Sequence, residues 1–179
     1  MKTAEQMYEY CLENNFGQGF TKKWGLKHFR VIEKNLLPNE EVLMTFIGLH
    51  NYQSMTKHDG NYAYAITNNR ILIAQKKVIG ENLKIVLLNN LNDVSTSTGM
   101  IMGTITFDTI REVFNVMVDK KQTNNIMSKI HDIVFDKPKE GNERTGSIAD
   151  ELKSLKELLD DGILTQEEFN EQKAKILSR

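Results

Sequence analysis

Residues 60–77 show the clearest alternation of side chains in the sequence. Large apolar residues alternate with small ones between 60 and 67, and the alternation resumes between 70 and 76. This period of two is that of a β-strand. Asn68 and Asn69 separate the halves, and because asparagine tolerates positive φ we expect a two-residue type I′ turn there. The segment therefore predicts a β-hairpin.

The same period recurs through the middle of the chain. Predicted strands cover residues 41–49, 60–67, 70–76, 83–89, 93–98, 103–108 and 112–118. The connections between them are too short for the crossover of about a dozen or more residues that parallel strands need. We therefore predict an α+β protein built on a seven-stranded antiparallel β-sandwich or barrel.

Helical spacing flanks the predicted strands on both sides. Helices are predicted over residues 3–14, with Thr3 as N-cap, and over 22–36, where Pro38 ends the second. We expect them to form a helical lead-in over residues 1–37. A third helix should follow Asp119, which we expect to form a capping box with Gln122, and it should close the open end of a β domain spanning residues 38–136.

The C-terminal part of the sequence predicts a linker and a helical hairpin. Residues 137–146 are polar and contain one proline and two glycines, a composition typical of a flexible linker. In residues 147–179, Gly162 is placed to end one helix, and Thr165 is placed to begin another with Glu168 as its capping partner.

Apolar side chains recur at helical spacing along both predicted C-terminal helices. They are Leu152, Leu155, Leu158, Leu159, Ile163, Leu164, Phe169 and Ile176. Two short helices cannot bury all of these against each other, so the stripe must contact a second copy, the rest of the same chain or another protein. We predict an oligomerisation surface that makes the protein a homo-oligomer, and docking within the chain stays the alternative.

Net charge, apolar runs and cysteine content restrict the classes of protein to which the chain can belong. The 23 basic and 24 acidic residues give a formal net charge of −1, so any binding of nucleic acid or membrane must be local. No apolar run approaches the roughly 20 residues of a membrane span, and the N-terminal residues lack the apolar run of a signal peptide. Cys11 is the single cysteine, which excludes an internal disulfide. We expect a cytoplasmic protein.

One segment, residues 16–34, is locally basic. Lys22, Lys23, Lys27 and Arg30 lie there among aromatic residues. Such a pattern suits contacts with phosphates of an anionic membrane or of nucleic acid. The alternative is an amphipathic helix with its aromatic side chains against the β domain and its lysines in solvent.

Histidines are scattered, and no nucleophile motif, Walker spacing or metal-ligand spacing is present. We therefore predict no catalytic residue, metal site or cofactor, and expect no small-molecule substrate.

Two stretches resemble known families. Residues 147–178 resemble the short C-terminal domain called SHOCT, which implies oligomerisation or nucleic-acid binding. Residues 64–71 (YAITNNRI) and 86–94 (VLLNNLNDV), with the lead-in at 20–37, resemble bacterial pleckstrin-homology-like domains of the YokE type. That resemblance implies a binding module without naming its ligand.

Eukaryotic pleckstrin-homology domains that bind inositol phosphates use basic residues in the loop after the first strand. Here that loop offers Lys57 beside Asp59, so we do not expect phosphoinositide binding there. The sequence thus predicts a non-enzymatic pleckstrin-homology-like interaction module, oligomerised through its C-terminal hairpin and with an unknown protein partner. The alternative is a weak binder of anionic membrane or nucleic acid through residues 16–34.

Overall fold

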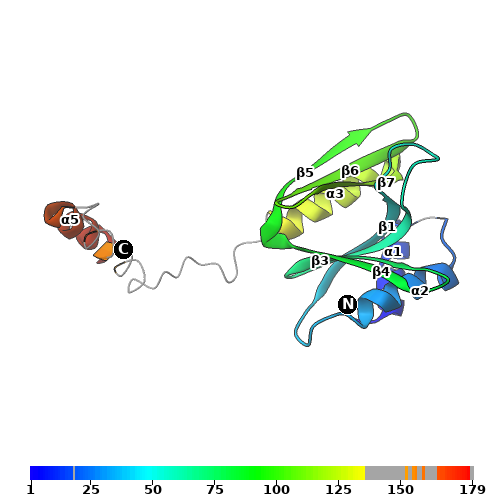
Figure 1. Cartoon of the computed structure of the whole chain (residues 1–179), viewed down its shortest axis with the longest axis horizontal. Helices are drawn as coiled ribbons and strands as arrows, with labels where there is room; N and C mark the ends of the chain where they lie inside the picture. The colour runs from blue at the N-terminus through cyan, green and yellow to red at the C-terminus, as the bar shows by residue number, and fades with distance from the viewer. Residues whose placement is uncertain (18, 136–151, 153–154, 157–158, 160–164, 178–179) are drawn as a thin grey trace. The chain divides into compact units, whose positions relative to one another are not determined.

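The computed structural model describes residues 1–17, 19–135, 152, 155, 156, 159 and 165–177 (Figure 1). The chain divides into two compact units, Met1–Asp136 and Lys137–Arg179. The linker predicted at 137–146 and the turn around Gly162 lie outside the described residues.

The first unit is built on one curled antiparallel sheet. Its strands are β1 (Val42–His50), β2 (Gly60–Thr67), β3 (Arg70–Lys76), β4 (Glu81–Leu87), β5 (Leu91–Thr98), β6 (Met102–Thr109) and β7 (Val113–Asp119), with a short 3₁₀ helix η1 (Leu88–Asn90) between β4 and β5. Their order is β4-β3-β2-β1-β7-β6-β5, so each pair of neighbours in the sheet is consecutive in sequence except β1 and β7, and the consecutive strands β4 and β5 lie at opposite edges. The predicted seven-stranded antiparallel architecture is confirmed.

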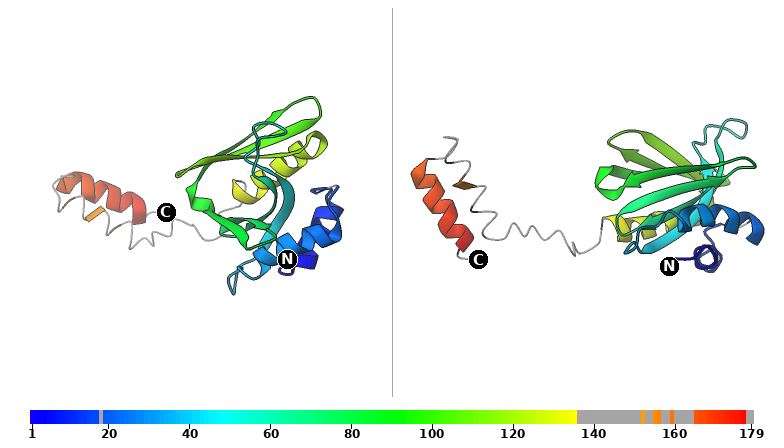
Figure 2. Two further views of the ribbon diagram at one scale, coloured as in Figure 1. Left: turned by 45° about the vertical axis from the view of Figure 1, so that its right-hand side comes forward. Right: turned by 60° about the horizontal axis from the view of Figure 1, so that its bottom comes forward.

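The inner face of the sheet encloses the main core, which helix α3 (Lys120–Val134) closes (Figure 2). The buried core residues lie on the strands and on α3, with their side chains directed into the main core. They include Phe46, Tyr64, Ile66, Ile71, Ile73, Ile105, Phe107, Val116, Ile126 and Ile130. The predicted closing helix is therefore present, and its apolar stripe is buried as expected for an amphipathic helix.

Two N-terminal helices, α1 (Ala4–Glu13) and α2 (Lys22–Glu33), cover the outer face of β1, β2 and β3. Small residues on that face, Ala63, Ala65 and Ala74, belong to the second core with the helices. The helices belong to the same compact unit as the sheet. The central strands are thus buried on both faces, which explains why large apolar residues alternate with small apolar ones.

The turn between β2 and β3 differs from the prediction. Neither Asn68 nor Asn69 has positive φ, so the type I′ assignment is wrong. Instead, the Thr67 hydroxyl accepts the Asn69 and Arg70 N–H groups at 3.1 and 3.0 Å. A threonine side chain therefore supplies the hydrogen bonds that organise this turn.

The helix caps agree with the sequence at one site and differ at another. Thr3 and Gln6 form the reciprocal capping box of α1. At α3 the Asp119 carboxylate accepts the Lys121 N–H at 2.8 Å, whereas Gln122 is buried. The predicted Asp119–Gln122 box is replaced by this simpler cap.

Candidate functional site

The basic segment forms α2 and divides into a buried and an exposed face. Thr21 begins the helix, its hydroxyl accepting the Trp24 N–H. Phe29 is fully buried, whereas Lys22, Lys23 and Lys27 are exposed. The segment is thus an amphipathic helix, and its lysines remain available at the surface.

Trp24 and His28 form a stacked pair on α2. Their ring centroids are 3.7 Å apart with an interplanar angle of 19°, and the Phe20 ring lies 4.6 Å from that of Trp24. Burial lowers the pKa of His28 and outweighs its hydrogen bond to the Trp24 carbonyl, with Lys27 adding to the decrease. The lowered pKa favours the neutral imidazole, and because a carbonyl oxygen only accepts, Nδ1–H donates to it at 2.9 Å.

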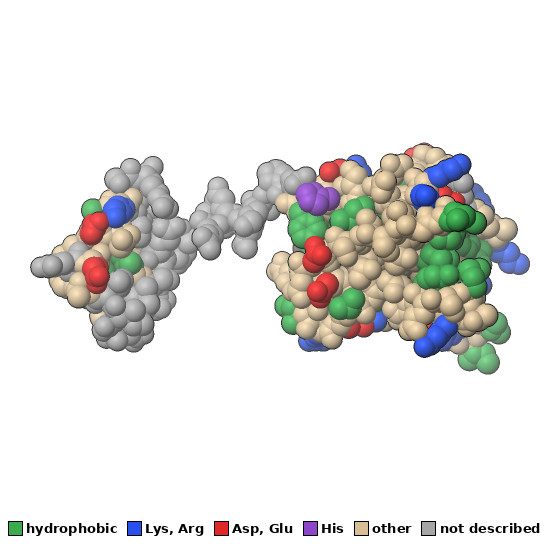
Figure 3. Space-filling view, turned by 90° about the horizontal axis from the view of Figure 1, so that it is seen from above, with side chains coloured by type: hydrophobic (Ala, Val, Ile, Leu, Met, Phe, Trp, Pro, Cys, Tyr) green, Lys and Arg blue, Asp and Glu red, His purple; other side chains and the backbone are tan. Residues whose placement is uncertain are grey.

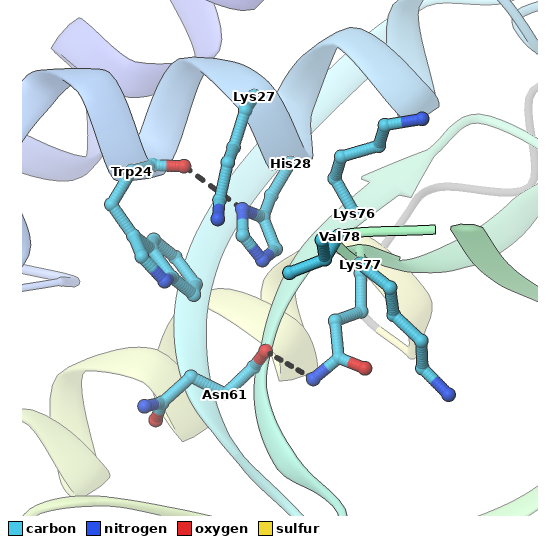
Figure 4. Close-up of a pocket in the computed structure, with 8 residues that line it drawn as sticks. Trp24, Lys27, His28, Asn61, Lys76, Lys77 and Val78 are labelled. Carbon is cyan, nitrogen blue, oxygen red and sulfur yellow. Dashed lines mark hydrogen bonds between the residues drawn. The ribbon is translucent and has the colours of Figure 1, made fainter. Parts of the chain in front are cut away.

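A surface cavity of about 390 Å³, called the α2 cavity below, lies between α2 and the end of β3 (Figure 4). Its lining residues come from α2, from β2, from the end of β3 and from the β3–β4 turn. They are Trp24, Lys27, His28, Asn61, Gln75, Lys76, Lys77 and Val78. Gln75 Nε2 donates to the Asn61 carbonyl at 3.2 Å, and this hydrogen bond links β3 to β2 within the cavity lining.

The charge of this cavity is positive. Its lining contains three lysines and no carboxylate. Lys76 Nζ lies 3.7 Å from the Glu81 carboxylate, but Lys27 and Lys77 form no ion pair with any residue that the structure describes. Two positive charges therefore remain uncompensated at the rim.

The β3–β4 turn projects an apolar tip beside these lysines. Val78 and Ile79 are 103% and 90% exposed. The Lys77 N–H donates to the Gly80 carbonyl at 3.2 Å, and Gly80 has the positive φ of 78° that closes the turn. Turns are ordinarily polar, so two aliphatic residues at a tip require an explanation.

The structure gathers only part of the predicted anion-binding set. Lys27 lines the cavity, whereas Arg30 pairs with Glu5 at 3.5 Å. Sequence reasoning missed Lys76 and Lys77. The sequence signal that could have revealed them is the aliphatic pair Val78 and Ile79, which directly follows the two lysines at the predicted end of a strand.

The β1–β2 loop forms a second, more polar cavity of about 530 Å³ with the start of β7. Lys57 is the one lysine in its described lining, which also contains Asp59. The Asp59 carboxylate accepts the Asn51 side-chain amide at 2.8 Å. The loop therefore lacks the concentration of positive charge that the α2 cavity has.

The histidines and the cysteine do not converge. His50 is buried, with Nδ1 2.7 Å from the Tyr64 hydroxyl, and burial lowers its pKa to about 4. Burial likewise raises the pKa of the Cys11 thiol to about 12. No group of three or more His, Cys, Asp or Glu side chains within the described parts of the chain could hold a metal ion.

The second unit contains helix α5 (Gln166–Leu177). Thr165 and Glu168 cap it reciprocally, the threonine N–H reaching the carboxylate at 2.9 Å and the Glu168 N–H reaching the hydroxyl at 3.3 Å. Phe169 is half-buried, and Leu152, Leu155 and Leu159 are half-buried in helical conformation.

The remaining residues of the predicted oligomerisation set are not placed. Leu158, Ile163 and Leu164 lie outside the described residues, as does the side chain of Ile176.

Apolar side chains are exposed at several places on the first unit (Figure 3). A second apolar tip, Met100 and Ile101 of the β5–β6 turn, is 91% and 71% exposed. The cavity beside this turn contains Asp119 and no lysine in its described lining. No described helix has the length and apolarity needed to cross a membrane.

Family models match two parts of the chain. The model described as "Bacterial PH domain" matches residues 36–132, and the model described as "Short C-terminal domain" (SHOCT) matches residues 150–177. Both resemblances inferred from the sequence are thereby confirmed. A search among curated proteins finds no match.

Solved structures with similar architecture share little sequence with this chain. A DUF1696 family protein with a pleckstrin-homology domain from Shewanella loihica PV-4 is 10% identical, with a TM-score of 0.42 over 59% of this chain and 88% of that chain. Autoinhibited Vav1 is 10% identical, with a TM-score of 0.43 over 77% and 23%. The hSac2 domain of human phosphoinositide phosphatase Sac2 is 11% identical, with a TM-score of 0.43 over 65% and 84%.

Proposed function

The chain belongs to the bacterial PH domain family, and from this premise we propose that it is a non-enzymatic binding module whose copies assemble through the C-terminal segment. Pleckstrin-homology-like folds serve many binding functions, so the family supports a binding role and leaves the ligand open. The segment that matches the short C-terminal domain supplies the means of assembly.

The observation that carries this proposal is the apolar stripe at Leu152, Leu155 and Leu159. Spacings of three and four residues place these side chains on one face of a helix. All three are helical and only half-buried. The same stripe on a second copy would cover this apolar face. In a two-fold symmetric dimer the same surface of each copy forms the interface.

Light scattering on the full-length protein tests the assembly. We expect a mass above that of one chain, and a variant with Leu152→Ser, Leu155→Ser and Leu159→Ser should have the mass of a single chain. Lys156→Ser is the matched control, because this exposed residue belongs to the same helical segment.

A chain ending at Asp136, the last residue of the first compact unit, should also be monomeric. The proposal fails if the full-length protein is monomeric, or if the triple leucine variant keeps the mass of the assembly.

A further inference from the structure

We infer that the α2 cavity and the β3–β4 tip together bind the surface of an anionic lipid bilayer. In this arrangement Val78 and Ile79 enter the interfacial region of the bilayer, while Lys27, Lys76 and Lys77 contact headgroup phosphates. Of these residues, Lys27 belongs to α2, which precedes the residues 36–132 that the family model matches.

The β3–β4 tip is apolar and almost fully exposed. Val78 and Ile79 project from a tight turn and bury almost none of their surface in the first unit. Because the tip is convex, it suits insertion into a soft apolar layer better than the filling of a rigid protein pocket. Interfacial helices bind membranes through apolar side chains flanked by Lys and Arg, and this tip presents the same combination.

The lysines of the cavity lie close to this tip. Lys77 is adjacent to the apolar tip, and Lys27 reaches the same cavity from α2 (Figure 4). Neither lysine forms an ion pair within the described residues. Binding a headgroup phosphate would therefore break no existing ion pair of Lys27 or Lys77. Lysine stems can extend along apolar surface and place their ammonium groups at headgroup level.

Nucleic acid fits this surface less well. Binding of single strands relies on aromatic faces on which bases stack. Trp24 has one face stacked on His28 at 3.7 Å and lies against Phe20. In addition, a phosphate backbone offers no apolar surface that the aliphatic side chains of the tip could contact. The combination of charge and exposed aliphatic side chains therefore favours a bilayer.

Cosedimentation of the full-length protein with vesicles tests the inference. We expect binding to vesicles of phosphatidylcholine mixed with phosphatidylglycerol, weakening as salt is raised, and little binding to phosphatidylcholine alone. Trp24 is the single tryptophan and lines the cavity, so its emission should shift to shorter wavelength when the protein binds.

Two double variants separate the contributions of charge and apolar surface. Lys27→Gln with Lys77→Gln should weaken binding by about fivefold for each lysine. Val78→Ser with Ile79→Ser should weaken it by about tenfold or more for each side chain.

Each double variant has a matched control elsewhere on the first unit. Lys57→Gln with Lys129→Gln removes the same charge, and Met100→Ser with Ile101→Ser removes a comparable apolar tip. Both controls should bind vesicles nearly as the unchanged protein does, because these residues lie outside the α2 cavity and its tip.

Several results would overturn the inference. They are failure to bind anionic vesicles at low salt, equal binding to neutral vesicles, equal losses in the control variants, and preferential binding of DNA that abolishes vesicle binding. A monomeric chain would carry the same surface, so vesicle binding and assembly through the C-terminal segment can fail independently.

Discussion

At the level of single residues, a buried ion pair joins the β2–β3 hairpin to the segment that precedes β1. Glu40 is 1% exposed, and Arg70 donates to its carboxylate through Nε and Nη2, each at 2.7 Å. The Leu37 N–H and the Thr67 hydroxyl donate to the same carboxylate. Burial acts to raise the pKa of Glu40, but these hydrogen bonds prevail and lower it.

Arg70→Met should therefore reduce the free energy of unfolding by about 3–5 kcal/mol, because it leaves a buried carboxylate unpaired. Urea denaturation measures the loss. Arg30→Met is the matched control, since the ion pair of Arg30 with Glu5 is exposed and should contribute less than about 1 kcal/mol. Equal losses in the two variants would show that the Glu40–Arg70 pair does not stabilise the fold as argued.

His50 makes the stability of the first unit depend on pH. Burial, with Lys84 contributing, lowers its pKa from 6.5 to about 4, while Asp59 and Glu112 act in the opposite direction. The unfolded chain therefore binds the proton more readily than the native protein does. Stability should fall as pH decreases from about 6.5 and should stop falling, for this group, near pH 4.

At about 1.4 kcal/mol per pH unit, the His50 contribution over that interval is about 3 kcal/mol. The double variant His50→Phe with Tyr64→Phe should remove this part of the pH dependence while preserving the aromatic packing. Urea denaturation at a series of pH values measures it. A residual slope of the same sign is expected, because burial also lowers the pKa of His28.

His58→Gln is the control for the His50 experiment, since His58 is exposed in the β1–β2 loop. It should keep the fall in stability between about pH 6.5 and pH 4, because His50 is unchanged in this variant. A double variant whose curve matches that of the unchanged protein would contradict the assignment to His50.

At the level of elements, β1 connects the two halves of the curled sheet. It pairs with β2 along most of its length but with β7 only through Leu49 opposite Met117 and His50 opposite Val116. Gly48 lies where the strands begin to converge, and a Cβ atom there would be 2.4 Å from Val116 Cγ1. The lack of a side chain therefore permits the close approach of β1 and β7.

Gly48→Ala should destabilise the first unit by about 1–3 kcal/mol, because the added methyl also meets the Met117 carbonyl oxygen at 2.9 Å. Denaturation in urea measures the change. Gly99→Ala is the control, since its Cβ would lie 3.4 Å from the nearest atom in ordinary contact. If Gly48→Ala is as stable as Gly99→Ala, the close approach of β1 to β7 does not require the absence of a side chain at position 48.

Most elements could be predicted from the sequence because their signals are local. Strand alternation and helical spacing located all seven strands and the helices α1, α2 and α3. The β2–β3 turn could not be predicted in the same way, since Thr67 is held partly by Glu40, 27 positions earlier. The candidate site was only half predicted for a similar reason: Lys27 joins Lys77 through packing of α2 on β3, which no local pattern reports.

At the level of the whole molecule, the two proposals reside in different compact units. The lysines and the apolar tip belong to Met1–Asp136, and the leucine stripe belongs to Lys137–Arg179. One copy presents a small apolar tip and two lysines that have no ion-pair partner among the described residues, which suits weak and reversible binding. Joining copies would place several such surfaces on one bilayer and raise the apparent affinity without any new contact.

This coupling predicts an asymmetric result for the two classes of variant. Replacing Leu152, Leu155 and Leu159 by serine should weaken vesicle binding by about a hundredfold, since avidity commonly exceeds single-site affinity by that factor or more. The remaining binding should still depend on salt, because the lysines are unchanged. Conversely, the Lys27→Gln, Lys77→Gln variant should keep the mass of the assembly in light scattering. Vesicle binding by the leucine variant as tight as that of the unchanged protein would mean that each copy acts alone, and the two units would then serve separate functions.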